Sequence, residues 1–198
     1  MTGDGKRDIW SEDPTDALAS TAAYLRAFGW TPGMPWGVEV RLPPGFDHAL
    51  AQREITRLPS EWARLGVVGS GGRAIPDHGP ASVLLPAGAR GPAFLIFANF
   101  DVVKRYNNAT SYALAVGHLA DRIGGGPAIS APWPRGDRAL TRSDRAELQR
   151  RLTERGFHTG GVDGRLGPNS LRALRAWQRS VGLPPDGYAH GAVLDALR

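Results

Sequence analysis

A polar cluster in the middle of the chain has the residue types of a carbohydrate-binding surface. Residues 106–111 read Tyr-Asn-Asn-Ala-Thr-Ser, directly ahead of a segment with helical periodicity. An asparagine amide both donates and accepts hydrogen bonds, so Asn107 and Asn108 suit the N-acetyl and hydroxyl groups of an amino sugar. The ring of Tyr106 can cover the apolar face of a sugar. The structural alternative is that Asn108 or Thr110 only caps the following helix and that Tyr106 belongs to the core.

Two helices must hold this cluster in place. Phe100, Val103 and Tyr106 have the spacing of the buried side of a short helix, and residues 107–111 connect it to the next helix. Connections on rigid supports are common places for ligand contacts. From Ser111 onward apolar positions recur at intervals of three and four, which predicts a second helix with one buried stripe. The members of this stripe are Tyr112, Ala115, Val116, Leu119, Ala120 and Ile123.

The residues before the cluster predict a helix and then a small sheet. A helix is expected over residues 16–28. Residues 38–42 alternate like a strand, and the apolar runs 81–87 and 93–98 between Gly and Pro turns indicate more buried strands. We therefore expect a small, largely antiparallel β subdomain at about residues 36–98. The apolar side of the first helix comprises Ala17, Leu18, Thr21, Tyr24, Leu25 and Phe28.

A change of composition divides the chain after the second helix. Residues 124–140 are too rich in Gly and Pro for a regular element and are predicted to be a linker. Thr141 and Asp144 have the spacing of a helix capping pair, and Pro168 suits the first turn of a further helix. The predicted fold class is α+β, in which a helical domain with the small antiparallel β subdomain precedes a three-helix domain at residues 141–198.

Composition excludes several classes of protein. The chain has 198 residues, 41% of them hydrophobic and 22% charged, which is typical of a globular protein. It contains no cysteine, so it has no disulfide framework, thiolate zinc site or cysteine nucleophile. No apolar run approaches the roughly 18 residues of a membrane span, and the first ten residues lack the apolar core of a signal peptide. We predict no transmembrane segment and no signal peptide in this chain.

The positive charge raises the question of a nucleic-acid partner. The net charge is +5, and the excess falls mainly in residues 141–198. The arginines there alternate with acidic residues along predicted helices, which is typical of a solvated face. No nucleic-acid-binding motif accompanies them. We predict no nucleic-acid partner, and attraction to an anionic cell-wall polymer fits the same charge.

Residues 99–123, NFDVVKRYNNATSYALAVGHLADRI, resemble the signature near the end of the catalytic domain of the membrane-bound lytic murein transglycosylase B family. The segments DIW, DALASTAAYL, GW and PPGFD precede it in the order shown by the alpha-proteobacterial type of these enzymes. The resemblance implies that residues 1–123 are the carboxy-terminal part of such a domain, with a partial lysozyme-like fold. It also implies that Tyr106, Asn107 and Tyr112 contact the glycan substrate.

The end of the chain resembles the peptidoglycan-binding module of many cell-wall hydrolases. Residues 148–197 match its pattern of Leu-Gln, Val-Asp-Gly, Gly-Pro, Trp-Gln and Asp-Gly. We expect Asp163 and Asp186 to fix loops and Trp177 to be core, so that binding uses exposed loops and the helix face beside them. A wall-cleaving domain followed by a wall-binding domain implies that peptidoglycan glycan strands are the partner and that the protein acts in the periplasm.

The resemblance does not extend to a catalytic acid. In that family one glutamate, in a Gly-x-Glu-Ser/Thr context, protonates the bond between N-acetylmuramic acid and N-acetylglucosamine and then takes the proton of the muramic C6 hydroxyl, giving a 1,6-anhydro product. No such motif occurs here, so we assign no catalytic residue and expect the chain to be inactive alone. A missing amino-terminal catalytic half is then a further expected partner. The glutamates, all in other contexts, are Glu12, Glu39, Glu54, Glu61, Glu147 and Glu154.

Residues 2–8 resemble the latter part of the calcium-binding loop of the same family. Thr2, Asp4 and Asp8 match ligand or near-ligand positions, but the first aspartate of the loop is absent. We therefore predict no metal site and no other cofactor. The alternative to an enzyme portion is a non-catalytic peptidoglycan-binding or scaffolding protein.

Overall fold

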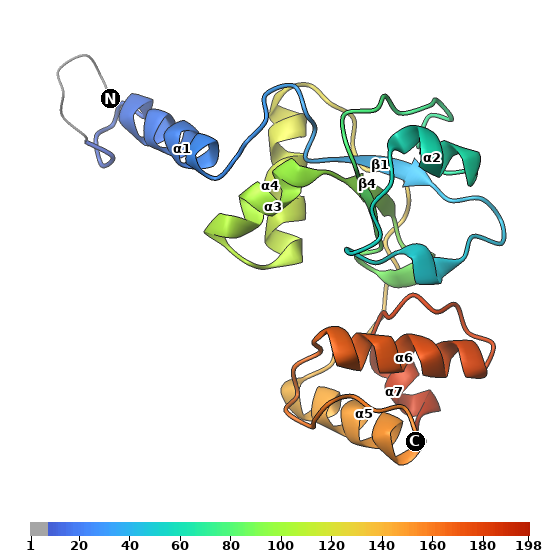
Figure 1. Ribbon diagram of the computed structural model, residues 1–198. Coiled ribbons are helices and arrows are strands. Elements are labelled where there is room, and N and C mark those ends of the chain that lie inside the picture. The colour runs from blue at the N-terminus through green and yellow to red at the C-terminus, as the bar shows by residue number, and fades with distance from the viewer. Residues whose placement is uncertain (1–7) are drawn as a thin grey trace.

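The computed structural model describes residues 8–198 and has the predicted α+β architecture (Figure 1). Within these residues one helix precedes the strands, one lies among them and the others follow. The helices are α1 Thr15–Ala27, α2 Pro59–Arg64, α3 Ala98–Tyr106, α4 Thr110–Ile123, α5 Arg142–Glu154, α6 Pro168–Ser180 and α7 Gly191–Ala196, with the short 3-10 turns η1 His48–Leu50 and η2 Gly88–Arg90.

The described strands form one antiparallel sheet in the order β2-β1-β4-β3. In its centre Val38 of β1 and Val83 of β3 both pair with Leu95 of β4. This arrangement confirms the small antiparallel sheet predicted from the alternating and apolar runs. The strands are β1 Gly37–Arg41, β2 Val68–Gly69, β3 Ser82–Leu84 and β4 Ala93–Ile96.

Both faces of the sheet are covered by a hydrophobic core. Successive residues of β4 point to opposite sides and so enter different cores. Leu95 belongs to the core on the side of α2, where Trp62 is fully buried and donates its Nε1 hydrogen to a backbone oxygen 2.8 Å away. Phe94 and Ile96 belong to the opposite core, with Phe100 of α3. Burial on both faces explains why β4 has a continuous apolar sequence rather than an alternating one.

The buried face of α4 differs from the predicted stripe. Within that stripe Leu119 and Ile123 are 60% and 80% exposed. The helix instead turns Gly117 toward the indole ring of Trp36, so closely that a Cβ atom there would lie 2.5 Å from the ring. The buried face of α4 is therefore the one whose backbone packs against the Trp36 ring. The spacing of apolar side chains in the sequence did not reveal this face. The buried residues of α4 are Ala113, Leu114 and Gly117.

The predicted apolar side of α1 is also largely uncovered. Leu18 is 65% exposed and Phe28 is 46% exposed, and Asp16 is the buried residue of this helix. Figure 1 shows α1 lying to one side of the sheet, near the ends of α3 and α4. The periodicity predicted the helix correctly, but these described residues do not bury its apolar side.

Residues 126–133, which we call the strap, follow α4 without forming a helix or strand but are bound to the sheet. The carboxylate of Glu39 in β1 accepts hydrogen bonds from the backbone N–H groups of Ser130 and Ala131 at 2.8–3.0 Å, and from the Ser130 hydroxyl at 2.9 Å. The side chain of Ile129 packs on the core beside α3 and α4. The strap thus holds the chain along the sheet before it enters α5.

The last three helices form the predicted bundle. Thr141 and Asp144 make the expected reciprocal cap at the start of α5, with the Thr141 Oγ1 accepting from the Asp144 N–H and the Asp144 carboxylate accepting from the Thr141 N–H. Asp163 and Asp186 fix loops, because each accepts a backbone hydrogen bond two residues ahead at 2.8 Å. Trp177 is buried as predicted. The bundle core is Leu140, Leu148, Leu152, Ala173, Leu174, Trp177, Val193, Leu194 and Leu197.

An ion-pair cluster joins the end of the chain to α5 and makes the bundle sensitive to acid. Arg198 and Arg151 donate hydrogen bonds to Glu147 and lower the pKa of its carboxyl from 4.5 to about 2. A depressed pKa stabilises the folded state above the unfolded pKa, and this contribution is lost as the pH falls from 4.5 toward 2.

We expect the bundle to melt at progressively lower temperature over that acidic range. Replacing Glu147 with glutamine should lower the melting temperature at neutral pH, and the gap between the two proteins should narrow as the pH falls toward 2 and close below it, where the Glu147 carboxyl becomes protonated. Thermal melts followed by circular dichroism at several pH values test this. A gap between the two proteins that stays constant from neutral pH to pH 2 would contradict it.

The three-helix bundle contacts the sheet domain at the loop that contains η2. The Asp186 carboxylate accepts a hydrogen bond from the Ala89 N–H at 2.8 Å, and Arg90 donates to both oxygens of Asp137 at 2.7 and 2.8 Å. Gly88 has a φ of +68°, and a Cβ atom there would lie 2.6 Å from the Asp186 carboxylate and 2.8 Å from Tyr188. Glycine is required at this junction for both its conformation and its small size.

Replacing Gly88 with alanine should therefore separate the bundle from the sheet. We expect an increased radius of gyration in small-angle X-ray scattering, because the added methyl group displaces Asp186. The matched control is Gly125→Ala, since Gly125 has a φ of +83° with nothing within 4 Å of the added Cβ atom. It introduces similar backbone strain, about 1 kcal/mol, without touching the junction. Equal radii for both variants would show that Gly88 does not control docking.

Candidate functional site

The three residues predicted to contact glycan lie together at the corner between α3 and α4. Tyr106 ends α3 and is 72% exposed, which corrects its assignment to the buried side of that helix. Its ring stacks on that of Tyr112 in the first turn of α4, with centroids 6.0 Å apart and planes inclined by 18°. Asn107 lies at the C-cap of α3, between them in sequence, and is exposed. We call Tyr106, Asn107 and Tyr112 the aromatic corner.

A third aromatic ring borders the corner from α1. Tyr24 meets Tyr106 edge-on, with centroids 6.0 Å apart, and also contacts Phe28 at 4.5 Å. The sequence predicted Tyr24 on the apolar side of its helix but did not predict that it lies beside Tyr106. Exposed, mutually supported aromatic rings offer flat faces to the apolar side of a sugar with little loss of side-chain freedom.

The Asn107 side chain has one structural contact. Its Oδ1 accepts a hydrogen bond from the Ala109 N–H at 3.1 Å, which fixes a local turn, whereas α4 begins after Ala109 without a side-chain cap from Asn108 or Thr110. Its Nδ2 group donates to no residue from Asp8 onward. An exposed amide with its acceptor engaged and its donors open can hydrogen-bond a carbonyl or hydroxyl oxygen of a ligand.

A cavity on the other side of α4 adds a tryptophan that the sequence did not single out. It encloses about 570 Å³ and lies between α4 and the strap. Trp133 of the strap is 43% exposed at its edge. Its position between two prolines could have indicated this. A tryptophan in a Gly/Pro-rich segment belongs to no helix or strand that would bury it in a core. The lining residues are Pro86, Thr110, Ser111, Leu114, Ala115, His118, Ile129 and Trp133.

The carboxylates around these surfaces have structural roles. Asp121 of α4 accepts the Trp36 Nε1 hydrogen at 2.8 Å, Asp101 pairs with Arg53, and Glu39 holds the strap. Glu61 caps α2 by accepting from the Leu58 N–H at 2.8 Å. The acid of a glycosidic cleavage must be free to exchange its proton with the substrate. These four groups are engaged in structural contacts, and the assignment of no catalytic residue stays a prediction.

The proposed remnant of a calcium loop falls largely outside the described residues. Thr2 and Asp4 belong to that undescribed part, and Asp8 accepts a hydrogen bond from the Trp10 N–H at 3.1 Å. From Asp8 to Arg198, no three His, Asp or Glu side chains gather as a metal site requires. Over the same residues no helix is both long and apolar enough to cross a bilayer.

Comparison with known proteins gives this geometry a family. Residues 1–121 match the family model described as a transglycosylase SLT domain. The chain belongs to the transglycosylase SLT domain family. After that domain, residues 141–197 match a peptidoglycan binding domain. Both matches agree with the two resemblances found in the sequence, and in the same order.

The solved relatives include SltB3 from Pseudomonas aeruginosa, crystallised in complex with NAG-anhNAM-pentapeptide and with NAG-NAM-pentapeptide. The first of these structures is 54% identical to this chain and superimposes with a TM-score of 0.93, covering 100% of this chain and 53% of SltB3. This similarity confirms the lysozyme-like α+β fold with a helical peptidoglycan-binding domain.

Two curated relatives match different parts of this SLT-family chain. Membrane-bound lytic murein transglycosylase B of Escherichia coli (strain K12) is 33% identical over 131 residues, which are 62% of this chain and 33% of that protein. Spore cortex-lytic enzyme of Bacillus cereus is 48% identical over 52 residues, which are 26% of this chain and 20% of that enzyme. The chain thus spans about half the length of SltB3 and a third of the transglycosylase.

Proposed function

We propose that this chain is the glycan-holding, carboxy-terminal portion of a lytic murein transglycosylase. In this proposal residues 1–123 belong to the catalytic domain, 124–140 are the linker and 141–198 bind peptidoglycan. The family match, the length shared with SltB3 and the wall-directed names of both curated relatives support it. A periplasmic location follows from a peptidoglycan substrate.

The aromatic corner carries the proposal. Tyr106 and Tyr112 present stacked rings, and the Asn107 Nδ2 group is open to a ligand oxygen. Stacking on a sugar face and one directed hydrogen bond are the contacts an N-acetylated sugar needs. These residues would hold the glycan while a glutamate of an amino-terminal catalytic half, supplied from outside this sequence, performs proton transfer. The parent reaction is then cleavage of the MurNAc-GlcNAc bond to a 1,6-anhydro product.

The test is binding of a GlcNAc-MurNAc oligosaccharide without peptide, measured by titration calorimetry and amide chemical shifts. Replacing Tyr106 with alanine should weaken binding about fivefold, as expected for a stacked aromatic contact of roughly 1 kcal/mol. Asn107→Asp should weaken binding at unchanged stability, because the carboxylate still accepts from the Ala109 N–H but donates nothing.

Asn108→Ala is the matched control. The sequence offered Asn108 for sugar contacts as well, but in the structure this exposed asparagine lines a hollow with Lys104 and Arg105 that no residue of the aromatic corner lines. Its binding should equal that of the parent chain. Equal affinity for the parent chain, Tyr106→Ala and Asn107→Asp would overturn the assignment of the corner. Incubation with sacculi tests the alternative of a non-catalytic binding protein. That alternative predicts that the protein co-sediments with the sacculi and that no form of it, with or without an amino-terminal half, releases anhydro-muropeptides from them.

A further inference from the structure

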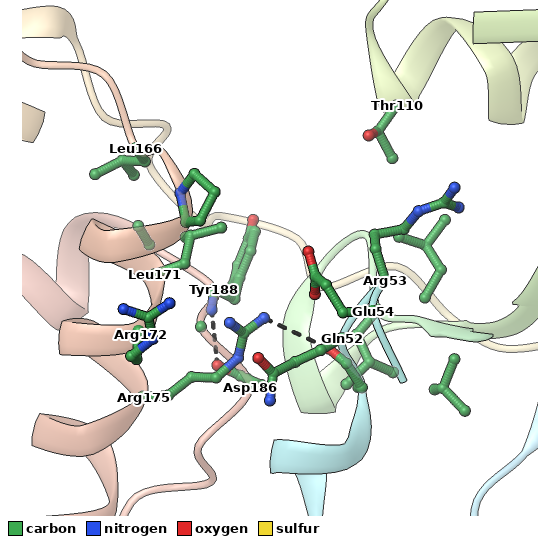
Figure 2. Close-up of a pocket in the computed structure, with 17 residues that line it drawn as sticks. Gln52, Arg53, Glu54, Thr110, Leu166, Leu171, Arg172, Arg175, Asp186 and Tyr188 are labelled. Atoms are coloured by element: carbon green, nitrogen blue, oxygen red, sulfur yellow. Dashed lines mark hydrogen bonds between the residues drawn. The ribbon is translucent and has the colours of Figure 1, made fainter. Parts of the chain in front are cut away.

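A second cavity lies between the two domains, apart from the aromatic corner. It encloses about 720 Å³. One wall comes from the loop after η1 and from β3, and the other comes from α6 and the loop before α7 (Figure 2). We call this cavity the interdomain groove. Its side chains that matter here are Gln52, Glu54, Arg172, Arg175, Asp186 and Tyr188.

Arg175 brings an incompletely bonded guanidinium into the groove. Its Nε atom is buried without a hydrogen-bond partner, and an Nη2 hydrogen reaches the Ala51 carbonyl only at 3.5 Å. Burial lowers the pKa of Arg175, and the carboxylates of Glu54 and Asp186 oppose this shift. A guanidinium has five N–H donors in a planar fork that matches a carboxylate. Arg175 therefore has donors available for an anionic ligand group, with Arg172 one turn earlier on α6.

Glu54 faces this arginine from the opposite wall. Figure 2 shows its carboxylate and the Arg175 guanidinium both reaching into the space between the domains. Among the described residues Glu54 makes no ion pair within 4.0 Å and is exposed. Asp186, by contrast, is already bonded to the Gln178 amide and to the Ala89 and Tyr188 N–H groups. The groove thus offers one open cationic and one open anionic group on facing walls.

We propose that the interdomain groove binds the peptide stem of peptidoglycan, with a stem carboxylate on Arg175 and the free amine of the stem's diamino acid on Glu54. This inference rests on the proposed function and adds the part of the substrate that this groove takes. A glycan without peptide brings no cation for Glu54, and a polyphosphate is repelled by Glu54. An extended peptide bearing both charges satisfies both walls.

The probe is a synthetic sugar-free stem pentapeptide of the diaminopimelate type, titrated into the whole chain. We expect amide shifts at Glu54, Arg175 and Tyr188 and none at the aromatic corner. Replacing Arg175 with methionine should weaken binding about tenfold or more, as expected for a lost charge-assisted hydrogen bond. Arg175→Lys should be intermediate, because it keeps the charge and loses the fork.

Glu54 is tested with a second peptide whose side-chain amine is acetylated. The parent chain should bind this peptide several-fold more weakly than the free amine, and Glu54→Gln should bind both equally. Arg155→Met is the control for charge, since Arg155 is exposed at the end of α5 and does not line the groove. Melting curves of the variants establish that they are folded.

Each outcome decides the inference. Loss of peptide binding in Arg175→Met with no change in Arg155→Met supports it. Equal binding by the parent chain, Arg175→Met and Glu54→Gln overturns it, and so does the absence of any binding to the free peptide. Binding of the peptide-free oligosaccharide is measured at the aromatic corner. It therefore tests the proposed function separately from the peptide site in the interdomain groove. Oligosaccharide binding without peptide binding would overturn only the groove.

Discussion

Replacing Gln149 with leucine should unfold the three-helix bundle. Gln149 is 2% exposed, and its Oε1 accepts from the N–H groups of Asp163 and Gly164 at 3.0 and 2.8 Å. Its Nε2 group lies 2.9–3.0 Å from the Asp163 carboxylate, the Arg165 carbonyl and the Ser170 hydroxyl, which share its two hydrogens. Leucine fills the space but satisfies none of these groups. Stranding several buried polar groups costs about 3–5 kcal/mol.

A domain of this size has little stability in reserve, roughly 3–9 kcal/mol. Hydrogen exchange read by mass spectrometry should therefore show lost protection in α5, α6 and α7 while β1 and β4 stay protected. The control is Arg150→Leu, the neighbouring residue on α5, whose side chain is 55% exposed. It should leave protection unchanged. Protection in the bundle that survives Gln149→Leu would show that this side chain does not organise the loop between α5 and α6.

Adding a single methyl group at Gly117 should destabilise the sheet domain, against the usual preference of helices. Alanine is favoured over glycine within a helix by about 1 kcal/mol. At Gly117, however, the new Cβ atom would lie 2.5 Å from the Trp36 ring, whose Nε1 is held by Asp121 at 2.8 Å. Overpacking of this kind costs about 1–3 kcal/mol. After the helix preference is subtracted, we expect Gly117→Ala to lower the free energy of unfolding by roughly 1 kcal/mol, and leucine by more.

Ala115→Gly measures the helix preference separately, because Ala115 is exposed on the same helix. This control should also destabilise the protein, by about 1 kcal/mol, so that alanine is favoured at one position and disfavoured at the other. Urea denaturation followed by tryptophan fluorescence gives both values. Stabilisation by Gly117→Ala would mean that Trp36 can move aside and that the ring does not select the buried face of α4.

Tertiary packing overruled local pattern at two places in the fold. Periodicity located α4 but predicted the wrong face, because Gly117 has no side chain to count and yet lies directly against the Trp36 ring. It also assigned Tyr106 to the core, whereas the chain turns away at Asn107 and leaves the ring 72% exposed. A burial pattern read along one helix omits the partner that the helix meets.

The candidate site could be predicted in part. The resemblance to the transglycosylase family indicated Tyr106, Asn107 and Tyr112, and the structure brings them together at one corner, where glycan contact stays a prediction. Trp133 and the facing pair Arg175 and Glu54 were not singled out. The first lies in a strap whose position depends on Glu39, and the other two are brought together only by docking of the bundle.

Local interactions account for what could be read from the chain alone. Three features each involve residues only a few positions apart: the reciprocal cap of Thr141 and Asp144, the glycine turns and the alternation of β1. A short stretch of sequence is therefore enough to predict them. The contact face of α4, the course of the strap and the interdomain groove depend on residues such as Glu54 and Arg175, which are far apart in sequence. Their geometry follows from which surfaces fit together, and that is settled when the whole chain has packed.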